Sequence, residues 1–450
     1  MAQFRVPSGA ERLRKTAFRP CFGAFLSAGY NTAIFRRSAG TQQMQLMAEQ
    51  QTYRLDIRKI MQQELLEAHF QQVVSMTRQS VCGMEGLIRC KLAPVPPNAL
   101  FEAAEAEELT VQLDRQCRET ILREYARIHA SYPEKMLFIN VDASVLDSVG
   151  GSGYLIRQVE KYRIPPGRVV VEINEARVLG TMALNAFIRV NREAGFLLAL
   201  DDVGAGFSNL DRIAIVKPDI IKVDMSLVRH IESDYHRQEV FRSMVRLASR
   251  IGAVAVAEGV ESEEEALTVL RLGASMIQGF YFSRPQRLEG EPYANGRIEH
   301  LTERFKEHMV RRSADEHSRY ASTAMVMRGA LDVLTRHSQF DKALVGIVNG
   351  SEAVECAYVL DENGVQCSNT VFRPGNEGRQ NSLFYSARSG EDHSMKRYYY
   401  GLSGTNDRFM TEPYVSMATG SLCVTFSEAF HDAGDSKRIL CMDFKSDQIV

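Results

Sequence analysis

The sequence predicts an α/β protein with a TIM-type (β/α)8 barrel, followed by a helical linker and a smaller α+β domain. From about residue 66, short apolar runs alternate with amphipathic stretches of helical period, which indicates repeated strand–helix units. Eight such runs can be counted, and eight parallel strands close a barrel. The chain has 450 residues, of which 45% are hydrophobic and 24% charged, so more than one globular domain is expected.

The predicted strands are continuously apolar, as in VVVEI and LLALD, which is typical of strands buried on both faces. They are His69–Met76, Met84–Cys90, Met136–Val141, Val169–Ile173, Phe196–Leu200, Ile220–Val223, Ala253–Ala257 and Met276–Phe282. The helices predicted around them are Glu107–His129, Gly153–Tyr162, Thr181–Ala194, His236–Ile251 and Ser262–Leu272. Each has apolar residues at helical spacing.

Polar and acidic residues recur at the tips of seven strands. They are Glu85, Asn140, Glu172, Asp201 with Asp202, Lys222 with Asp224, Glu258, and Gln278. One acid after a strand is usually a helix cap or a loop residue, but seven strands together are hard to assign to capping. In a parallel barrel such tips converge at the C-terminal rim, where barrel enzymes place their chemistry.

The acids gathered at this rim require positive charge beside them. Two carboxylates about 4 Å apart repel by roughly 4 kcal/mol at an effective dielectric near 20. Carboxylates and the Asn140 carbonyl, with no His or Cys among them, favour Mg²⁺ or Mn²⁺ over zinc. The adjacent Asp201 and Asp202 suit two ions, which is an arrangement for phosphoryl displacement by an activated water. The predicted chemistry is phosphodiester hydrolysis.

Two further residues have roles that spacing leaves open. Lys222 either compensates the acids or orients the attacking water. Glu258 serves either as a base or as a support for water and metal.

Seven segments resemble, in order and spacing, the signature of the EAL-domain family. They are EGLIR from Glu85, NVDAS from Asn140, VEINE ending at Glu175, DDVGAGFSNL from Asp201, KVD from Lys222, AEGVE ending at Glu261, and QGFYFSRP ending at Pro285. The resemblance covers about residues 57 to 290 without a long gap. It implies a TIM-like barrel that opens cyclic di-GMP to linear pGpG with two Mg²⁺ or Mn²⁺ ions.

The resemblance also implies roles for single residues. Glu85, Asn140, Glu172 and Asp201 would bind one ion, and Asp201 with Asp202 would serve the second. Lys222 would position the water, with Glu258 and Gln278 completing the site. Glu175 would hold the DDVGAGFSNL loop in its productive form. That loop would lie near a dimer contact, so a homodimer is expected.

Substrate contacts are carried over in the same way. FQQVV resembles the family's YQPIV strand, and the substrate-binding candidates are Gln71, Leu87, Arg89, Asp224, Glu261, Gln278 and Pro285. Arg89 also has a physical reason, because a guanidinium matches phosphate oxygens. The departures from the family pattern are Gly86 for Ala, Gln72 for Pro, and Val203, Ala205 and Phe207 for Phe, Thr and Tyr. They remove no charged or metal-binding group and bear on rate and regulation.

Behind the barrel, Ile298–His337 is helical in composition and is expected to be a connecting helix. It is either an ordinary amphipathic surface helix or a dimer seam or signalling lever. From about Leu344, the runs ALVGIVNG, VECAYVLDENG and SLCVTFSEAF indicate short strands. KRYYY, TEPY and SLCVTFS resemble the ligand-binding half of Cache or PAS-like domains. This resemblance implies a regulatory sensor in which Arg397, Tyr399 and Tyr414 face a small-molecule ligand. The alternative is an aromatic core with a surface Arg.

Composition excludes several other classes of protein. The net charge of −2 gives no field for a nucleic acid polymer or an anionic membrane, and the eight cysteines include no CxxC pair. No stretch reaches the roughly 18 apolar residues of a membrane span, so a cytoplasmic protein is expected. The expected domains are a poorly ordered leader (1–50), the barrel (57–290), a helical connector (295–340) and the sensor (341–450). The Arg-rich leader also fits a targeting peptide.

Two alternatives to an active phosphodiesterase remain. The first is an inactive EAL-type receptor that binds cyclic di-GMP and signals through the C-terminal domain; such degenerate members usually lack several of the acids, whereas this chain lacks none. The second is a scaffold whose C-terminal region recruits a partner. No GGDEF-like synthase signature is present.

Overall fold

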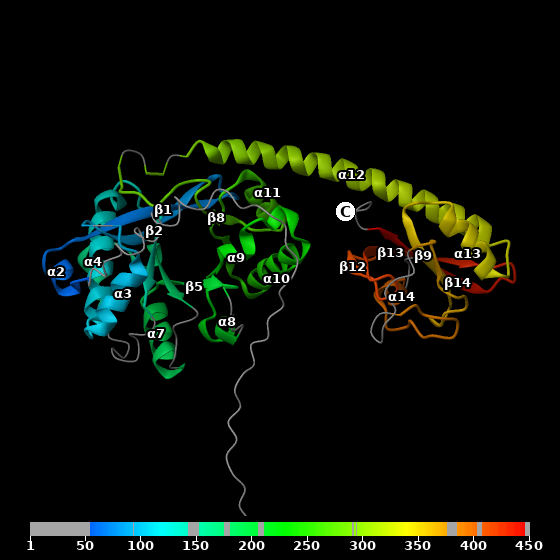
Figure 1. Cartoon of the computed structure of the whole chain (residues 1–450), viewed down its shortest axis with the longest axis horizontal. Helices are drawn as coiled ribbons and strands as arrows, with labels where there is room; N and C mark the ends of the chain where they lie inside the picture. The colour runs from blue at the N-terminus through cyan, green and yellow to red at the C-terminus, as the bar shows by residue number, and fades with distance from the viewer. Residues whose placement is uncertain are drawn as a thin grey trace, which may run out of the picture. The chain divides into compact units, whose positions relative to one another are not determined.

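A computed structural model describes nine segments of the chain (Figure 1). They are residues 55–92, 94–142, 153–174, 181–205, 211–289, 292–293, 295–375, 385–402 and 407–445. Within them no helix is both long enough and apolar enough to cross a membrane.

Eight strands close into a barrel in sequence order, as predicted. They are β1 Leu66–Ser75, β2 Ser80–Cys90, β3 Met136–Val141, β4 Val169–Asn174, β5 Leu197–Val203, β6 Ile220–Val223, β7 Val254–Ala257 and β8 Met276–Gln278. The helices of this region are α2 Ile57–Gln62, α3 Pro97–Ala106, α4 Thr110–His129, α6 Tyr154–Lys161, α7 Thr181–Glu193, α8 Asp211–Val216, α9 Met225–Val228, α10 Tyr235–Ile251 and α11 Glu263–Arg271. All five predicted helices are present with slightly shifted ends.

The prediction that every barrel strand runs parallel is wrong for β1. β2 to β8 are parallel to their neighbours, whereas β1 is antiparallel to both β2 and β8. Only the turn Met76–Gln79 separates β1 from β2. A parallel crossover needs a dozen or more residues, so this connection can only form a hairpin.

The hairpin also changes where Glu85 lies. Glu85 is in the middle of β2 and not at its tip, because β2 extends to Cys90 along β1. Only Gly83–Gly86 of β2 pair with β3, so Glu85 still lies where the barrel part of this strand ends.

The C-terminal region is a second, smaller α+β unit with its own sheet. The long helix α12 Arg297–Leu334 and the helix α13 Phe340–Asn349 precede β9 Val354–Asp361, β10 Val371–Phe372, the short helix α14 Arg397–Tyr400, β11 Arg408–Met410, β12 Tyr414–Val415, β13 Leu422–His431 and β14 Lys437–Lys445. The sheet is antiparallel with the order β10-β9-β14-β13-β11, and β12 also pairs with β13.

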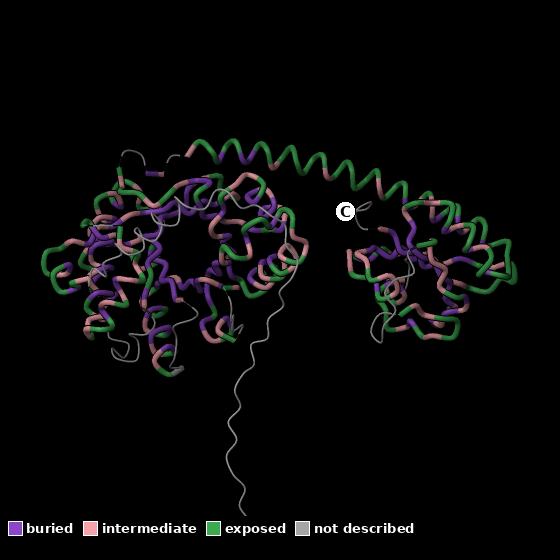
Figure 2. Tube along the Cα trace, in the orientation of Figure 1, coloured by how far each residue is buried: buried purple, intermediate pink, exposed green. Residues whose placement is uncertain are grey.

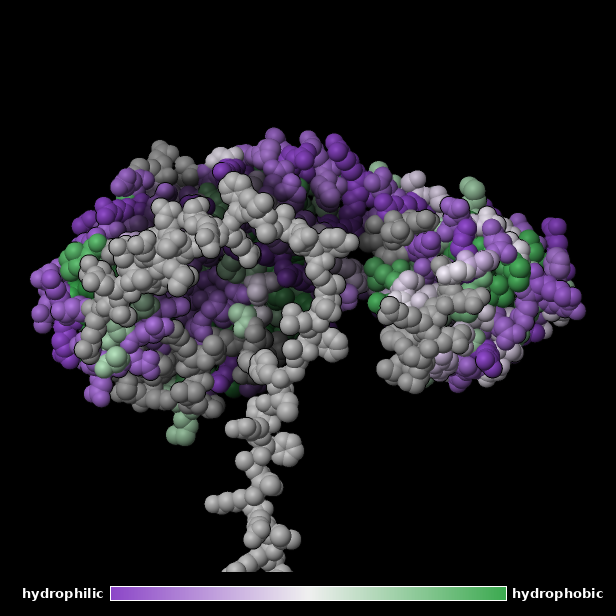
Figure 3. Space-filling view, in the orientation of Figure 1, coloured by the Kyte–Doolittle hydropathy of each residue, from purple (hydrophilic) through white to green (hydrophobic). Residues whose placement is uncertain are grey.

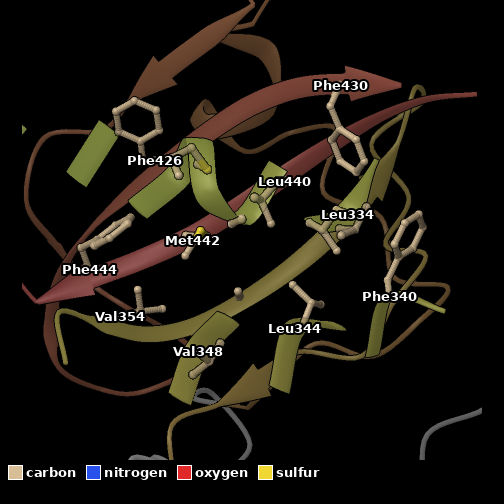
Figure 4. Close-up of a cluster of buried hydrophobic side chains, with 14 of the residues drawn as sticks. Leu334, Phe340, Leu344, Val348, Val354, Phe426, Phe430, Leu440, Met442 and Phe444 are labelled. Atoms are coloured by element: carbon tan, nitrogen blue, oxygen red, sulfur yellow. The ribbon is translucent and has the colours of Figure 1, made fainter. Parts of the chain in front are cut away.

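The expected strand in ALVGIVNG is wrong, because these residues lie in α13. Phe340, Leu344 and Val348 recur every four residues and are buried against Leu440 and Met442 of the sheet (Figure 4). This spacing is that of one face of a helix. The run ALVGIVNG contains only Leu344 and Val348 of this buried face, because Phe340 lies before the run. The run by itself is therefore too short to show the helical period.

α12 is buried only near its two ends. Ile298 and Leu301 are buried near its start, and Met327 and Leu334 belong to the C-terminal core. Figure 2 shows the middle of the helix mainly as exposed, and Figure 3 shows mainly hydrophilic side chains over it. In the described part of the chain, the middle of α12 is therefore mainly exposed and hydrophilic, and few of its side chains are buried.

Candidate functional site

The barrel interior has an apolar layer directly below a polar layer. Phe138, Val170, Ala199, Ile220 and Val256 pack together inside the barrel, with Met276 beside them. Two residues further along each of these strands come Asn140, Glu172, Asp201, Lys222, Glu258 and Gln278. Because strand side chains alternate between the two faces, a residue two positions on points to the same interior, one step nearer the C-terminal rim. The alternation therefore brings the predicted residues together.

Lys222 is at the centre of this polar layer. Its side chain is 1% exposed, and its Nζ lies 2.6 Å from Glu172 Oε1, 2.7 Å from Glu258 Oε1 and 3.0 Å from Asp201 Oδ1. Glu85 Oε2 lies slightly further away, at 3.6 Å. One ammonium group thus faces four carboxylates and compensates only part of their charge.

Two amide side chains link the acids. Asn140 Nδ2 donates to Glu85 Oε1 and to Glu172 Oε2, both at 3.0 Å. Gln278 Nε2 donates to Glu85 Oε2, and its buried Oε1 accepts no hydrogen bond from the described residues. In this arrangement the NH₂ of Asn140 faces the carboxylates, whereas the sequence predicted its carbonyl oxygen as a ligand.

Reversal of β1 adds Gln71 to the site. Gln71 precedes the core residue Val73 by two positions, and because β1 runs against β2 this step again leads towards the C-terminal rim. Its Oε1 accepts from Gln278 Nε2 at 3.3 Å, and its Nε2 donates to the Ser283 carbonyl at 3.0 Å.

Asp202 reaches the same site through an irregular backbone. Its φ of +55° interrupts the strand geometry, and the β5–β6 register shifts between Leu200 and Val203. Without this interruption, consecutive side chains would point to opposite faces. Carboxylate oxygens of Asp201, Asp202 and Glu258 consequently lie within 4.8 Å of one another. Asn174 donates to Asp202, a contact that the sequence analysis missed although Asn174 ends the VEIN strand.

The electrostatics of the site are those of a crowded set of acids. Burial raises the pKa of Glu172 well above its usual value, and Glu85 adds to this rise. Burial likewise raises the pKa of Glu258 and of Asp202. Burial alone would lower the pKa of Lys222, but the surrounding carboxylates raise it well above its usual value. The site therefore favours bound positive charge.

The other predicted substrate residues lie on β2, at the start of α9 and in the segments that follow β7 and β8. Leu87 and Arg89 follow Glu85 on the same face of β2, and Arg89 Nη1 donates to the Ile88 carbonyl at 2.8 Å. Asp224 caps α9 by accepting from the Ser226 amide. The remaining positions are Glu261, which pairs with Arg229 at 2.8 Å, and Pro285, which follows β8; Glu175 lies outside the described residues.

The predicted sensor residues are not brought together. Tyr414 lines a cavity of the C-terminal unit, but Arg397 and Tyr399 are not among its lining residues. Arg397 is exposed, and the Tyr399 hydroxyl donates to the Glu362 carbonyl at 2.9 Å. Tyr358 and Asp443, which no sequence motif singled out, do line the cavity.

The fold and the rim define a barrel protein whose oxygen donors surround one buried lysine. The sequence model described as the EAL domain matches residues 54–285, and the chain belongs to the EAL-domain family.

Curated relatives and a solved structure agree with this assignment. The chain is 31% identical over 224 residues to the Pseudomonas aeruginosa protein RocR, named a cyclic di-GMP phosphodiesterase; the match covers 49% of this chain and 57% of RocR. It is 25% identical over 390 residues to YkuI of Bacillus subtilis, an uncharacterized EAL-domain protein, covering 81% of this chain and 91% of YkuI. The crystal structure of YkuI, in complex with cyclic di-GMP and calcium, superposes with a TM-score of 0.71 at 22% identity. It covers 87% of this chain and 99% of the YkuI chain, and at this identity it shows a shared fold.

Proposed function

We propose that the barrel hydrolyses cyclic di-GMP to linear pGpG with the aid of two divalent cations. The observation that carries this proposal is the convergence of four carboxylates on Lys222 at the C-terminal rim. Membership of the EAL-domain family, the name of RocR and the ligand of the YkuI crystal support the choice of substrate.

The donor set fits Mg²⁺ or Mn²⁺. Apart from the ammonium of Lys222, the groups described at the centre are carboxylate and amide oxygens and amide NH₂ groups, and oxygen donors are what these hard ions prefer. The proposed ligands are Glu85, Asn140, Glu172 and Asp201 for one ion and Asp201 with Asp202 for the second. Asn140 would have to turn its amide to offer oxygen, and N and O of an amide are assigned from their hydrogen bonds. When bound, such ions stabilise charge on phosphoryl oxygens and lower the pKa of the attacking water.

The side chains of the chain itself supply orientation and proton transfer. In hydrolysis, the oxygen of water joins phosphorus, one phosphorus–ester oxygen bond breaks, and the released alcohol oxygen takes a proton. Lys222 is placed to orient the water through its N–H donors. Glu258, with its raised pKa, is placed to accept the proton that the water loses. Gln71 and Arg89 are the proposed contacts to substrate, together with Leu87, Asp224, Glu261, Gln278 and Pro285.

A direct assay tests this proposal. The full chain is incubated with cyclic di-GMP and Mg²⁺ or Mn²⁺, and pGpG is quantified by chromatography. We expect metal-dependent product formation and, for Glu85→Gln, a loss of at least about 100-fold. Glu264→Gln, at an exposed position of α11, is the matched control and should retain full activity. Binding of cyclic di-GMP without any pGpG would support the receptor alternative instead.

We further propose that the chain acts as a homodimer and that residues 341–450 form a sensor, of the Cache or PAS-like type, that regulates the barrel. The separate hydrophobic core of this region supports an independent domain. Light scattering tests the dimer, since a monomeric mass at all protein concentrations would contradict it.

A further inference from the structure

The C-terminal unit contains a cavity on the face of its sheet opposite to α12 and α13. α12 and α13 cover one face, where Val424, Phe426 and Met442 pack against them. The neighbouring residues Thr425 and Asp443 point to the opposite face, because side chains alternate along a strand. A cavity of about 170 Å³ lies there. It is lined by four tyrosines and three acids, with Lys396 and His393 among the other residues.

Asp443 is a buried carboxylate without a cationic partner. Asp443 is 2% exposed and lies on β14, two residues before the strand ends. Thr425 Oγ1 donates to its Oδ1 at 2.7 Å, and Ser416 Oγ donates to its Oδ2 at 3.0 Å. Among the described residues, no Lys, Arg or His side chain forms an ion pair with it. Buried carboxylates are normally paired with a cation, so this arrangement is unusual.

A second buried acid, Glu355, adds negative charge close to Asp443. Glu355 on β9 is 4% exposed and accepts from Ser421 Oγ at 2.5 Å and from Thr419 Oγ1 at 3.2 Å. Its partners are hydroxyl groups, as for Asp443. Glu355 does not line the cavity itself, but its charge contributes to the raised pKa of Asp443, which does line it.

The aromatic side chains of the cavity are held in place by one another. Tyr358 and Tyr398 meet edge to face with ring centroids 6.0 Å apart, and the Tyr398 hydroxyl lies 2.7 Å from His393 Nδ1. The Tyr414 hydroxyl donates to Thr425 Oγ1 at 2.5 Å, because the Thr425 proton is used on Asp443. The faces of tyrosine rings attract cations, most strongly cations with little hydration.

We propose that this cavity binds a small organic ammonium ion, held by the Asp443 carboxylate and the rings of Tyr358, Tyr398 and Tyr414. The charge excludes an anion, because three acids face one exposed lysine. The aromatic lining disfavours a metal ion, which needs six or more oxygen ligands. The proposal gives the sensor region a ligand class, and the binding does not depend on phosphodiesterase activity.

Calorimetric titration of the full chain tests the proposal with two matched pairs of probes. Choline is compared with its neutral isostere 3,3-dimethylbutan-1-ol, and butylammonium with butan-1-ol. We expect at least one ammonium ion to bind saturably and at least about tenfold more tightly than its neutral partner. Equal affinity within both pairs, or no saturable binding up to about 10 mM, would overturn the proposal.

Variants assign the binding to this cavity. Asp443→Asn keeps the shape and should weaken ammonium binding at least about tenfold. Asp435→Asn, in an exposed turn, should have no effect. Tyr414→Leu removes one ring. It should weaken binding of the ammonium ion and leave the affinity for the neutral isostere unchanged. Unchanged affinity in Asp443→Asn, with circular dichroism showing an intact fold, would sink the proposal. A chain that binds the ion but produces no pGpG would contradict only the proposed hydrolysis.

Discussion

Lys222 shows how much of the site depends on a single side chain. It is buried among four carboxylates, and its ammonium offsets part of the repulsion between them. Removing one partner of a buried ionic cluster leaves uncompensated charge, which costs about 3 to 5 kcal/mol. A divalent cation can supply the missing charge.

We therefore predict that Lys222→Met lowers the free energy of unfolding by about 3 to 5 kcal/mol in EDTA and by less in Mg²⁺. Urea denaturation followed by circular dichroism measures both values. Lys306→Met, on the exposed part of α12, is the control and should change neither value by more than about 0.5 kcal/mol. Equal destabilisation with and without Mg²⁺ would argue against a metal site at Lys222.

Asp443 gives a prediction about pH. Burial raises the pKa of Asp443, so the folded protein binds this proton more tightly than the unfolded chain does. The stabilisation from the bound proton is complete below the unfolded pKa near 3.9, and it is lost as pH rises through the raised folded pKa. Ionising this carboxylate therefore costs the folded protein free energy that the unfolded chain does not lose.

Asp443→Asn should therefore be more stable than the unmodified chain at pH 7, because the amide leaves no charge to bury. The difference should shrink as pH falls towards 4. Hydrogen exchange in β13 and β14 reports the local free energy of opening. A variant that is less stable at pH 7, or a difference that grows at low pH, contradicts the prediction.

At the scale of elements, the packing of β2 against α4 explains a departure from the family pattern. A Cβ at Gly86 would lie 2.3 Å from Ile121 Cγ2, which is too close for any side chain. Ile121 is a buried residue of α4 and occupies the space that alanine would need. The glycine is thus matched to this helix.

Gly86→Ala should destabilise the barrel by about 1 to 3 kcal/mol through overpacking. Ile121→Leu removes the branch that clashes, so the double variant should be more stable than the sum of the two single changes implies. A double-mutant cycle by urea denaturation measures the coupling. Additive effects would show that Ile121 is not the obstacle.

α13 offers a second test of an element. Leu344 is fully buried in the C-terminal core, whereas the adjacent Val345 is exposed. Leu344→Ala should cost about 2 to 5 kcal/mol, and Val345→Ala less than about 0.5 kcal/mol. Thermal unfolding of the two variants checks this difference. Similar losses for both would contradict the helical face formed by Phe340, Leu344 and Val348.

At the scale of the whole molecule, the barrel and the C-terminal unit have separate cores, so unfolding is not expected to be one two-state transition. Divalent cations that bind only the folded barrel should stabilise it by about 2.7 kcal/mol at a free concentration of about 100 times Kd. We predict that Mg²⁺ or Mn²⁺ raises the barrel transition in calorimetry and leaves the C-terminal transition unchanged. Asp201→Asn should abolish the shift, and a shift that persists in this variant would place the ions elsewhere.

The sequence alone determined those features that neighbouring residues encode. Eight apolar runs alternating with amphipathic helices were enough to predict the barrel, and later short runs indicated a second α+β region. The polar residues at the ends of the runs placed Asn140, Glu172, Asp201, Lys222, Glu258 and Gln278 on one rim. The reversed direction of β1, the approach of four acids to Lys222 and the match between Gly86 and Ile121 were decided only by the tertiary structure. So were the helix in ALVGIVNG and the cavity at Asp443. The physical reason is range: local periodicity fixes which way a side chain points, but its partners come from segments distant in the chain, and only packing brings these together.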